Sequence, residues 1–371
     1  MRIAFVSYYF PEYCIRHVNE MVKQDDVLLM MPSSSESGHL QLLDSRVRYQ
    51  PFHQPRMRQP IRQLRTVLSM LGTLKQFAPD VVHYQHGHMY FNLALPRVRK
   101  YPLVVTIHDA RQHVGDKESK LTPQSIMDFG YRRADHVIVH GQSLIGTVAD
   151  DLHIARSKIH LIPHIAIGEE ASAVEHRDDG RTILFFGRIW EYKGLEYLIR
   201  AEPKVSAEFP NVRIVIAGKG DDFDQYRRMM VHPERFEVHN DWISDETRAE
   251  MFASSSIVVL PYIEASQSGV IPIAYTYQKP VIATRTGGLP DMVDHGKTGL
   301  LVPPRDADAL ADAILQLLRA PERRSAMGQA GQAKLRHECA PEVVAKATMD
   351  VYRKAIADRK QPRTRPVGVN A

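Results

Sequence analysis

Short apolar runs alternate with amphipathic segments along almost the whole chain, and this alternation restricts the fold more than any other feature. The runs are rich in Val, Ile and Leu, which is typical of buried strands in parallel sheets, and the helical spacing between them indicates β-α units. In the first half the predicted strands are residues 3–8, 27–31, 81–84, 103–107, 136–140 and 159–162. In the second half they are residues 182–186, 213–217, 236–239, 257–260, 281–283 and 299–302.

The length of the chain and a polar segment near its middle predict two lobes. A single core usually stops growing at about 250 to 300 residues, and this chain has 371. Residues 162–181 are polar, lack periodicity and separate the two series of strands. We therefore expect an α/β fold with two Rossmann-like, doubly wound lobes. The predicted divisions are residues 1–165, residues 166–345, and a C-terminal helix with a basic tail in residues 346–371.

Composition indicates an ordinary globular protein of a reducing compartment. The hydrophobic content is 44% and the charged content 25%. The chain has two cysteines, Cys14 and Cys339, which stand at opposite ends without metal-like spacing. The N-terminus lacks the long apolar region of a signal peptide, and no apolar run reaches the ~18 residues of a membrane span. We expect a cytoplasmic protein whose contact with membranes is peripheral.

One loop joins a predicted strand to a predicted helix and carries two cations. Gly187 and Arg188 follow the apolar run 182–186, and Lys193 and Gly194 precede a segment with helical spacing. Such a loop directs free backbone N–H groups and the positive end of a helix dipole to one place, where two cations suit an anionic diphosphate. A glycine turn with two solvated basic residues explains the spacing equally well.

The segments that follow this loop occur in a fixed order: IVIAGKGDD, LPYIEASQSGV and KPVIATRTGGLPDMVDHGKTGLLVPPRD. In this order the chain resembles the family-four glycosyltransferases of the GT-B fold, over residues 181–320 and more loosely before them. The resemblance implies that Arg188 and Lys193 bind the donor diphosphate. It also implies that Gly218 and Gly220 let the backbone approach the nucleotide, and that the last helix crosses back to the first lobe.

The chain departs from the paired-glutamate signature of that family. Counted back from Pro280, the two glutamate positions hold Ala265 and Ile273. We expect Glu264, one residue from the first position, to serve through a shifted loop. Nothing replaces the second carboxylate, which in the family binds the ribose hydroxyls.

The loop after Glu264 offers neutral hydroxyl and amide groups that suit hydrogen bonding to a sugar. These residues are Ser266, Gln267, Ser268 and Gly269, and the resemblance implies that the loop faces the donor sugar. The alternative is a polar turn before a buried helix.

His108 and Asp109 stand at the C-terminal end of an apolar strand, where ligands bind in open parallel sheets. The family carries a similar pair, which implies that His108 touches the donor sugar or its leaving phosphate and that Asp109 orients it. A strand cap is the alternative. The glycine pair of the family's first loop is missing, and residues 10–13 read Phe-Pro-Glu-Tyr instead.

No metal and no cofactor are expected. His83, His86 and His88 are close in sequence, but the chain holds 18 histidines and no nearby cysteine or paired carboxylates complete a site. Residues 296–298 resemble the end of a P-loop, but the required earlier glycine is Asp291.

Residues 45–79 carry six arginines and one lysine with no acidic residue, and apolar residues recur among them at helical spacing. The stripe consists of Ile61, Leu64, Val67, Leu68, Leu71 and Leu74. This basic amphipathic helix either docks on an anionic membrane surface or packs on the core with a solvated basic face. No nucleic-acid-binding motif accompanies the charge, so we expect no nucleic-acid partner.

Together these features predict a metal-independent, retaining glycosyltransferase of glycan, polysaccharide or glycolipid biosynthesis. It would move a sugar from a nucleotide-diphosphate donor to a hydroxyl of a glycan or lipid-linked acceptor. The alternatives are a catalytically weak or inactive protein that binds a sugar nucleotide or a partner, and a GT-B-like epimerase or phosphorylase.

Overall fold

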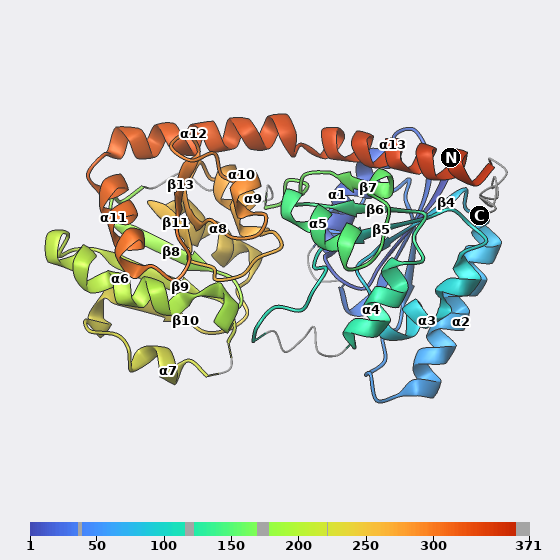
Figure 1. Ribbon diagram of the computed structural model, residues 1–371, viewed down its shortest axis with the longest axis horizontal. Coiled ribbons are helices and arrows are strands. Elements are labelled where there is room, and N and C mark those ends of the chain that lie inside the picture. Colours follow the sequence, from blue (N-terminus) through green and yellow to red (C-terminus); the bar gives the residue numbers. More distant parts are fainter. Residues whose placement is uncertain (36–38, 116–121, 169–177, 221, 361–371) are drawn as a thin grey trace, which may run out of the picture.

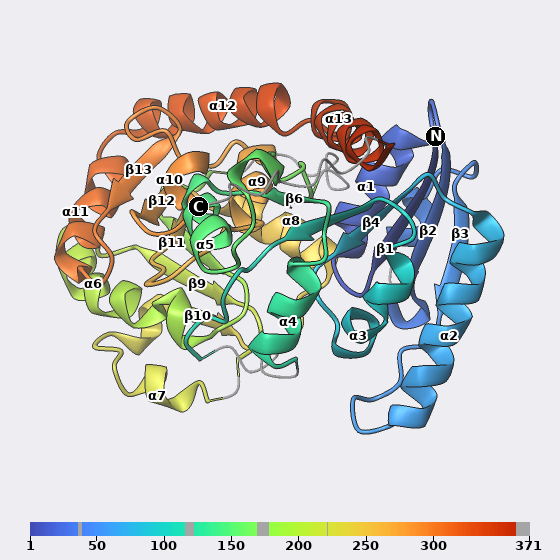
Figure 2. The same ribbon diagram turned by 45° about the vertical axis from the view of Figure 1, so that its right-hand side comes forward.

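The computed structural model describes residues 1–35, 39–115, 122–168, 178–220 and 222–360. Figure 1 shows two lobes side by side, with two consecutive helices running along one edge from the second lobe back to the first. Figure 2 shows the same helices spanning both lobes after a turn of 45°. Each lobe contains one parallel sheet, so the predicted α/β fold with two Rossmann-like lobes is confirmed.

The N-terminal lobe is built on a seven-stranded sheet in the order β3-β2-β1-β4-β5-β6-β7, with every neighbouring pair parallel. Its strands are β1 (Arg2–Ser7), β2 (Asp26–Pro32), β3 (Arg48–Phe52), β4 (Val81–Gln85), β5 (Leu103–Ile107), β6 (His136–Val139) and β7 (Ile159–Leu161). Its helices are α1 (Pro11–Met21), α2 (Pro60–Phe77), α3 (Met89–Val98), α4 (Gln124–Tyr131) and α5 (Gln142–Asp150). The strand order reverses between β1 and β4, where open α/β sheets bind ligands.

The C-terminal lobe repeats this plan with six parallel strands in the order β10-β9-β8-β11-β12-β13. The strands are β8 (Thr182–Phe186), β9 (Arg213–Ala217), β10 (Phe236–His239), β11 (Ile257–Leu260), β12 (Val281–Thr284) and β13 (Gly299–Val302). The helices are α6 (Leu195–Glu208), α7 (Asp224–Arg227), α8 (Asp245–Ser254), α9 (Val270–Thr276), α10 (Leu289–Met292) and α11 (Ala307–Leu318). Here the order reverses between β8 and β11.

Two long helices complete the described part of the chain, α12 (Pro321–Glu338) and α13 (Pro341–Lys360). Helix α13 packs on the N-terminal lobe, where the Tyr352 hydroxyl hydrogen-bonds His83 of β4 and Arg359 pairs with Asp135 at 2.9 Å. The C-terminal helix therefore lies on the first lobe, as Figure 1 shows. The divisions at residues 165 and 345 stay predictions, and the basic tail after residue 360 lies outside the described residues.

Strand β3 was not predicted from the sequence. It is an edge strand within the basic segment, and Arg48, Gln50 and Pro51 are exposed. An edge strand buries little, so the segment lacks the apolar run that marks the other strands.

Helix α2 begins with Pro60 in its first turn and ends at Phe77, and the next residue, Ala78, caps it with a left-handed φ of 49°. Val67 and Leu74 are buried, but Ile61, Leu64 and Leu68 are 68%, 56% and 55% exposed. The predicted apolar stripe is therefore wider than the core contact, and half of it faces solvent. Within the described ranges, no helix has the length and apolar content needed to cross a membrane.

Candidate functional site

The loops at the carboxyl ends of the two sheets meet between the lobes. The Gln142 amide donates to the Asp291 carboxylate at 2.6 Å, and the Val114 amide donates to Glu264 at 3.3 Å. A Cβ added to Gly141 would lie 3.0 Å from the carbonyl oxygen of a residue of the other lobe, Ser266. Loops from the carboxyl ends of both sheets therefore form one junction, and ligands bind at this end of the strands in open parallel sheets.

The loop after β8 carries both predicted cations, each against an aromatic ring. The Arg188 guanidinium lies 3.9 Å from the centroid of Trp190, and the Lys193 ammonium lies 3.8 Å from that of Tyr262. A cation over the face of an aromatic ring is attracted by the ring, so each contact helps to hold its cation in place. Gly194, with φ of 64°, directly precedes α6 and is its N-cap residue.

The glycines after β9 pack backbone against backbone. A Cβ on Gly218 would lie 2.1 Å from the carbonyl oxygen of Gly187, and one on Gly220 would lie 2.7 Å from that of Ile189. The Ile189 amide also donates to the Lys219 carbonyl at 2.9 Å. Glycine is therefore required here for the fit between two loops, whereas the predicted approach of a nucleotide stays a prediction.

The loop after β11 places hydroxyl and amide groups near Lys193. Ser266 and Ser268 are buried, and the Ser268 hydroxyl lies 3.3 Å from the hydroxyl of Tyr262, the residue whose ring contacts Lys193. The Gln267 side-chain oxygen is buried without a hydrogen-bond partner among the described residues. An unpaired acceptor of this kind costs stability unless a ligand satisfies it.

His108 is buried at the end of β5, and its tautomer follows from its contacts. Its Nε2 lies 2.8 Å from the Gln85 side-chain oxygen, which accepts, so Nε2 carries the proton. Nδ1 then keeps a lone pair and has no partner among the described residues. Burial and neighbouring histidines, His140 first among them, hold the pKa of His108 well below its ordinary value, so the ring is neutral.

The loop between β1 and α1 has a phenylalanine, Phe10, in the region where the family has its glycine pair. Phe10 has φ of 61°, in the left-handed region, and its ring centroid lies 4.4 Å from that of His108. Pro11 then starts α1. Left-handed conformations of non-glycine residues cost about 1 to 3 kcal/mol and gather at functional sites.

Comparisons with known proteins agree with this arrangement. The family described as "Glycosyltransferase Family 4" matches residues 12–165, and that described as "Glycosyl transferases group 1" matches residues 180–320. The chain belongs to the family-four glycosyltransferases.

Relatives of this glycosyltransferase include named transferases. A glycogen synthase of Mycobacterium tuberculosis is 28% identical over 315 residues, which cover 80% of this chain and 74% of the relative. A phosphatidyl-myo-inositol mannosyltransferase of Mycolicibacterium smegmatis is 31% identical over 177 residues, or 47% of this chain and 45% of the relative.

Solved structures share the fold of the glycosyltransferase. Sucrose-phosphate synthase from Thermosynechococcus elongatus has a TM-score of 0.77 at 18% identity, over 96% of this chain and 100% of that one. Anabaena HepE in complex with UDP and glucose has a TM-score of 0.72 at 16% identity, over 95% and 100%.

Sequence reasoning missed one residue of the glycosyltransferase that touches both lobes, His113. Its Nε2 lies 3.2 Å from both the Asp109 carboxylate and the Ser266 hydroxyl, and its Nδ1 lies 3.6 Å from Glu264. These contacts bring together Asp109, Glu264 and Ser266, which were predicted separately. No spacing in the sequence marks His113, because its partners come from distant loops.

Ile273 stands where the resemblance led us to expect the second glutamate of the family, and its side chain is buried in α9. A Cβ on Gly168 would lie 3.1 Å from its side chain, so Ile273 packs against Gly168. The site therefore offers no carboxylate at this position.

Within the part of the chain that the structure describes, no group of three or more His, Cys, Asp or Glu side chains could hold a metal ion. The expectation of metal-independent chemistry stays a prediction that chelation tests.

Proposed function

We propose that this glycosyltransferase is a retaining enzyme that moves a sugar from a nucleoside diphosphate to a hydroxyl of a glycan or lipid-linked acceptor. The observation that carries the proposal is the pair Arg188 and Lys193 before α6, each held on an aromatic ring. Both cations and the helix N-terminus suit the charge that develops on a departing diphosphate. Anabaena HepE, which has a similar fold, is solved in complex with UDP, and this supports a sugar-nucleotide donor.

The glycines shape the part of the junction that would take the nucleotide. Gly187 and Gly194 form the diphosphate loop, and Gly218 and Gly220 bring the second loop against it. The donor sugar lies against a third loop, which consists of Ser266, Gln267, Ser268 and Gly269.

On the N-terminal lobe, the Nδ1 lone pair of His108 accepts a hydrogen bond from a hydroxyl of the donor sugar. Asp109 and Glu264 orient the reacting groups from opposite lobes. Catalysis then depends on positioning and on stabilisation of the leaving group, without a covalent nucleophile.

Calorimetry with UDP-glucose, GDP-mannose and ADP-glucose tests the donor class, and a product assay on each binder tests transfer. Binding of at least one of them followed by sugar transfer supports the proposal. If a sugar nucleotide binds but its sugar is neither transferred nor released by hydrolysis, the result favours a protein that only binds sugar nucleotides. The reason to consider this alternative is that Ile273 replaces the expected carboxylate. Conversion of the sugar nucleotide itself would indicate an epimerase.

We also propose a peripheral membrane contact through α2, which brings the enzyme to a lipid-linked acceptor. Arg62 and Arg65 each follow an exposed apolar residue of α2, Ile61 and Leu64, and Arg58 stands just before the helix; all three arginines are exposed. A basic residue near an anionic surface contributes about 1 kcal/mol. Such a face suits the boundary between anionic headgroups and acyl chains. A cytoplasmic location fits the two free cysteines.

A further inference from the structure

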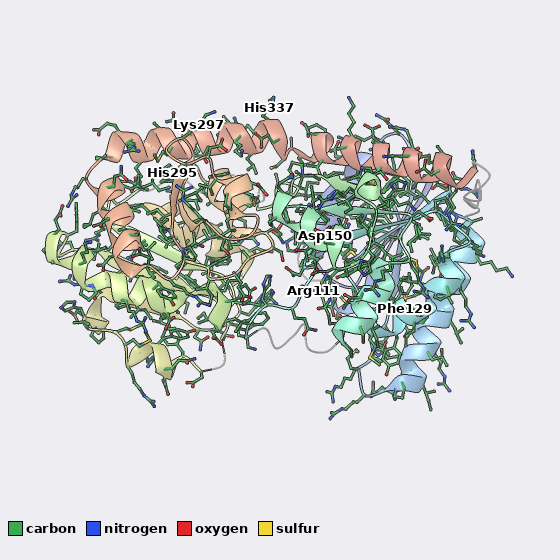
Figure 3. All side chains as sticks on the ribbon, in the orientation of Figure 1. Arg111, Phe129, Asp150, His295, Lys297 and His337 are labelled. Carbon is green, nitrogen blue, oxygen red and sulfur yellow. The ribbon has the colours of Figure 1, made fainter. Side chains whose placement is uncertain are left out.

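The loop after β5 reaches from the N-terminal lobe to the C-terminal lobe. Its base is fixed by Arg111, labelled in Figure 3, which pairs with Asp128 at 3.0 Å and Asp151 at 3.1 Å. Farther along, a Cβ on Gly115 would lie 2.9 Å from the Cβ of Glu191. The described part of this loop, residues 108–115, is therefore held by the first lobe at Arg111 and touches the second lobe at Gly115.

His113 lies in the middle of this loop and contacts groups of both lobes. Its ring stacks on Tyr192, with 4.8 Å between centroids and 23° between planes. Its Nε2 faces Asp109 and Ser266, and its Nδ1 faces Glu264. The side chain is only 13% exposed, so these contacts are largely shielded from water.

The charges around His113 favour its protonated form. Burial lowers the pKa of His113, and the nearby Lys193 ammonium lowers it further. The hydrogen bond to Asp109 and the negative charges of Asp109 and Glu264 raise it by more, so the pKa of His113 is raised above its ordinary value. Burial likewise opposes ionisation of Asp109, but His113 lowers the pKa of that carboxyl to about 2. Both nitrogens of a protonated imidazole carry a proton, so the ring can donate toward Asp109 and Ser266 from Nε2 and toward Glu264 from Nδ1.

We propose that His113 is a positioning residue whose ring holds Asp109 of the first lobe and Glu264 and Ser266 of the second in one arrangement. The inference rests on the proposed function, since it assigns His113 to the same site. We call these contacts of the protonated His113 ring with Asp109, Glu264 and Ser266 the His113 bridge. The bridge is complete at pH values below the ordinary pKa of histidine, and it is lost as the pH rises through the raised pKa of His113. Turnover therefore falls on the alkaline side when the bridge opens.

Three variants test this role. His113→Gln keeps a polar side chain, His113→Phe keeps a ring for stacking on Tyr192, and His337→Gln is a control on α12, labelled in Figure 3. Both His113 variants should bind UDP-glucose or GDP-mannose nearly as the wild type does, because the groups that hold the diphosphate are unchanged. Loss of positioning should lower kcat by about tenfold or more, and the alkaline decline should disappear. The control should match the wild type.

Titration of labelled histidine by NMR gives a readout that needs no substrate. The His113 signal should titrate above the ordinary value and move down in Asp109→Asn. A wild-type kcat and pH profile in His113→Phe, or an identical His113 titration in Asp109→Asn, would overturn the proposal. Failure of every nucleotide sugar to bind the wild type would instead contradict the proposed function, while the NMR titration still decides the bridge.

Discussion

Replacing Gly218 by Ala should destabilise the C-terminal lobe by about 2 to 6 kcal/mol. Gly218 has φ of 140°, and a side chain in such a region costs about 1 to 3 kcal/mol. The new Cβ would lie 2.1 Å from the carbonyl oxygen of Gly187, which is backbone and cannot rotate away. Overpacking of this kind costs about 1 to 3 kcal/mol more. The loop that carries Arg188 must then move.

Thermal unfolding measures the effect, with circular dichroism for the whole chain and fluorescence of Trp190 and Trp242 for the C-terminal lobe. A change of about 1 kcal/mol shifts the Tm of a lobe of this size by about 2 to 4 °C, so we expect a loss of at least about 4 °C. Gly72→Ala on α2 is the control, because an added Cβ there would meet no described atom within 4 Å apart from its chain neighbours and the backbone of its own helix. Ala there should be neutral or stabilising. Equal Tm values for Gly218→Ala and wild type would refute the reasoning.

Three further predictions concern other parts of the enzyme. Turnover should survive EDTA, and a rate abolished by chelation and restored by one divalent ion would contradict the mechanism. Cosedimentation with vesicles should rise with anionic lipid and fall with salt, and replacing Arg58, Arg62 and Arg65 by Gln should weaken it. Equal sedimentation with neutral vesicles would favour a solvated face. Burial opposes ionisation of Glu12, but His39 and its other partners lower its pKa from 4.5 to about 2. The ionised Glu12 should therefore stabilise the fold above its unfolded pKa of 4.5, and this contribution should be lost as the pH falls from 4.5 to about 2. In Glu12→Gln, the free energy of unfolding should depend less on pH over that range.

Much of the fold could be predicted because buried parallel strands leave continuous apolar runs. The predicted bounds 182–186 and 213–217 equal those of β8 and β9. The edge strand β3 could not be found in this way, since an exposed strand needs no apolar run. The exposure of Leu64 and Leu68 on α2 also escaped the pattern, because periodicity shows that a stripe exists and not how much of it is covered.

The loop that carries Arg188 and Lys193 could be picked out from the sequence because one short segment holds both cations, and their binding of a diphosphate stays a prediction. The contacts of His113 could not be predicted, because its partners come from distant loops. The close fit at Gly218 could not be predicted either, because it depends on how two backbone segments pack together. Spacing along one chain records neither kind of contact.

The central claim is that Arg188 and Lys193 hold the donor diphosphate, and calorimetry with matched variants tests it most directly. Arg188→Ala and Lys193→Ala should each lose about 2 to 5 kcal/mol of donor or transition-state interaction, the range for removing one partner of a close charge pair. Both should keep a Tm close to that of the wild type. Wild-type donor affinity and turnover in either folded variant would contradict the account.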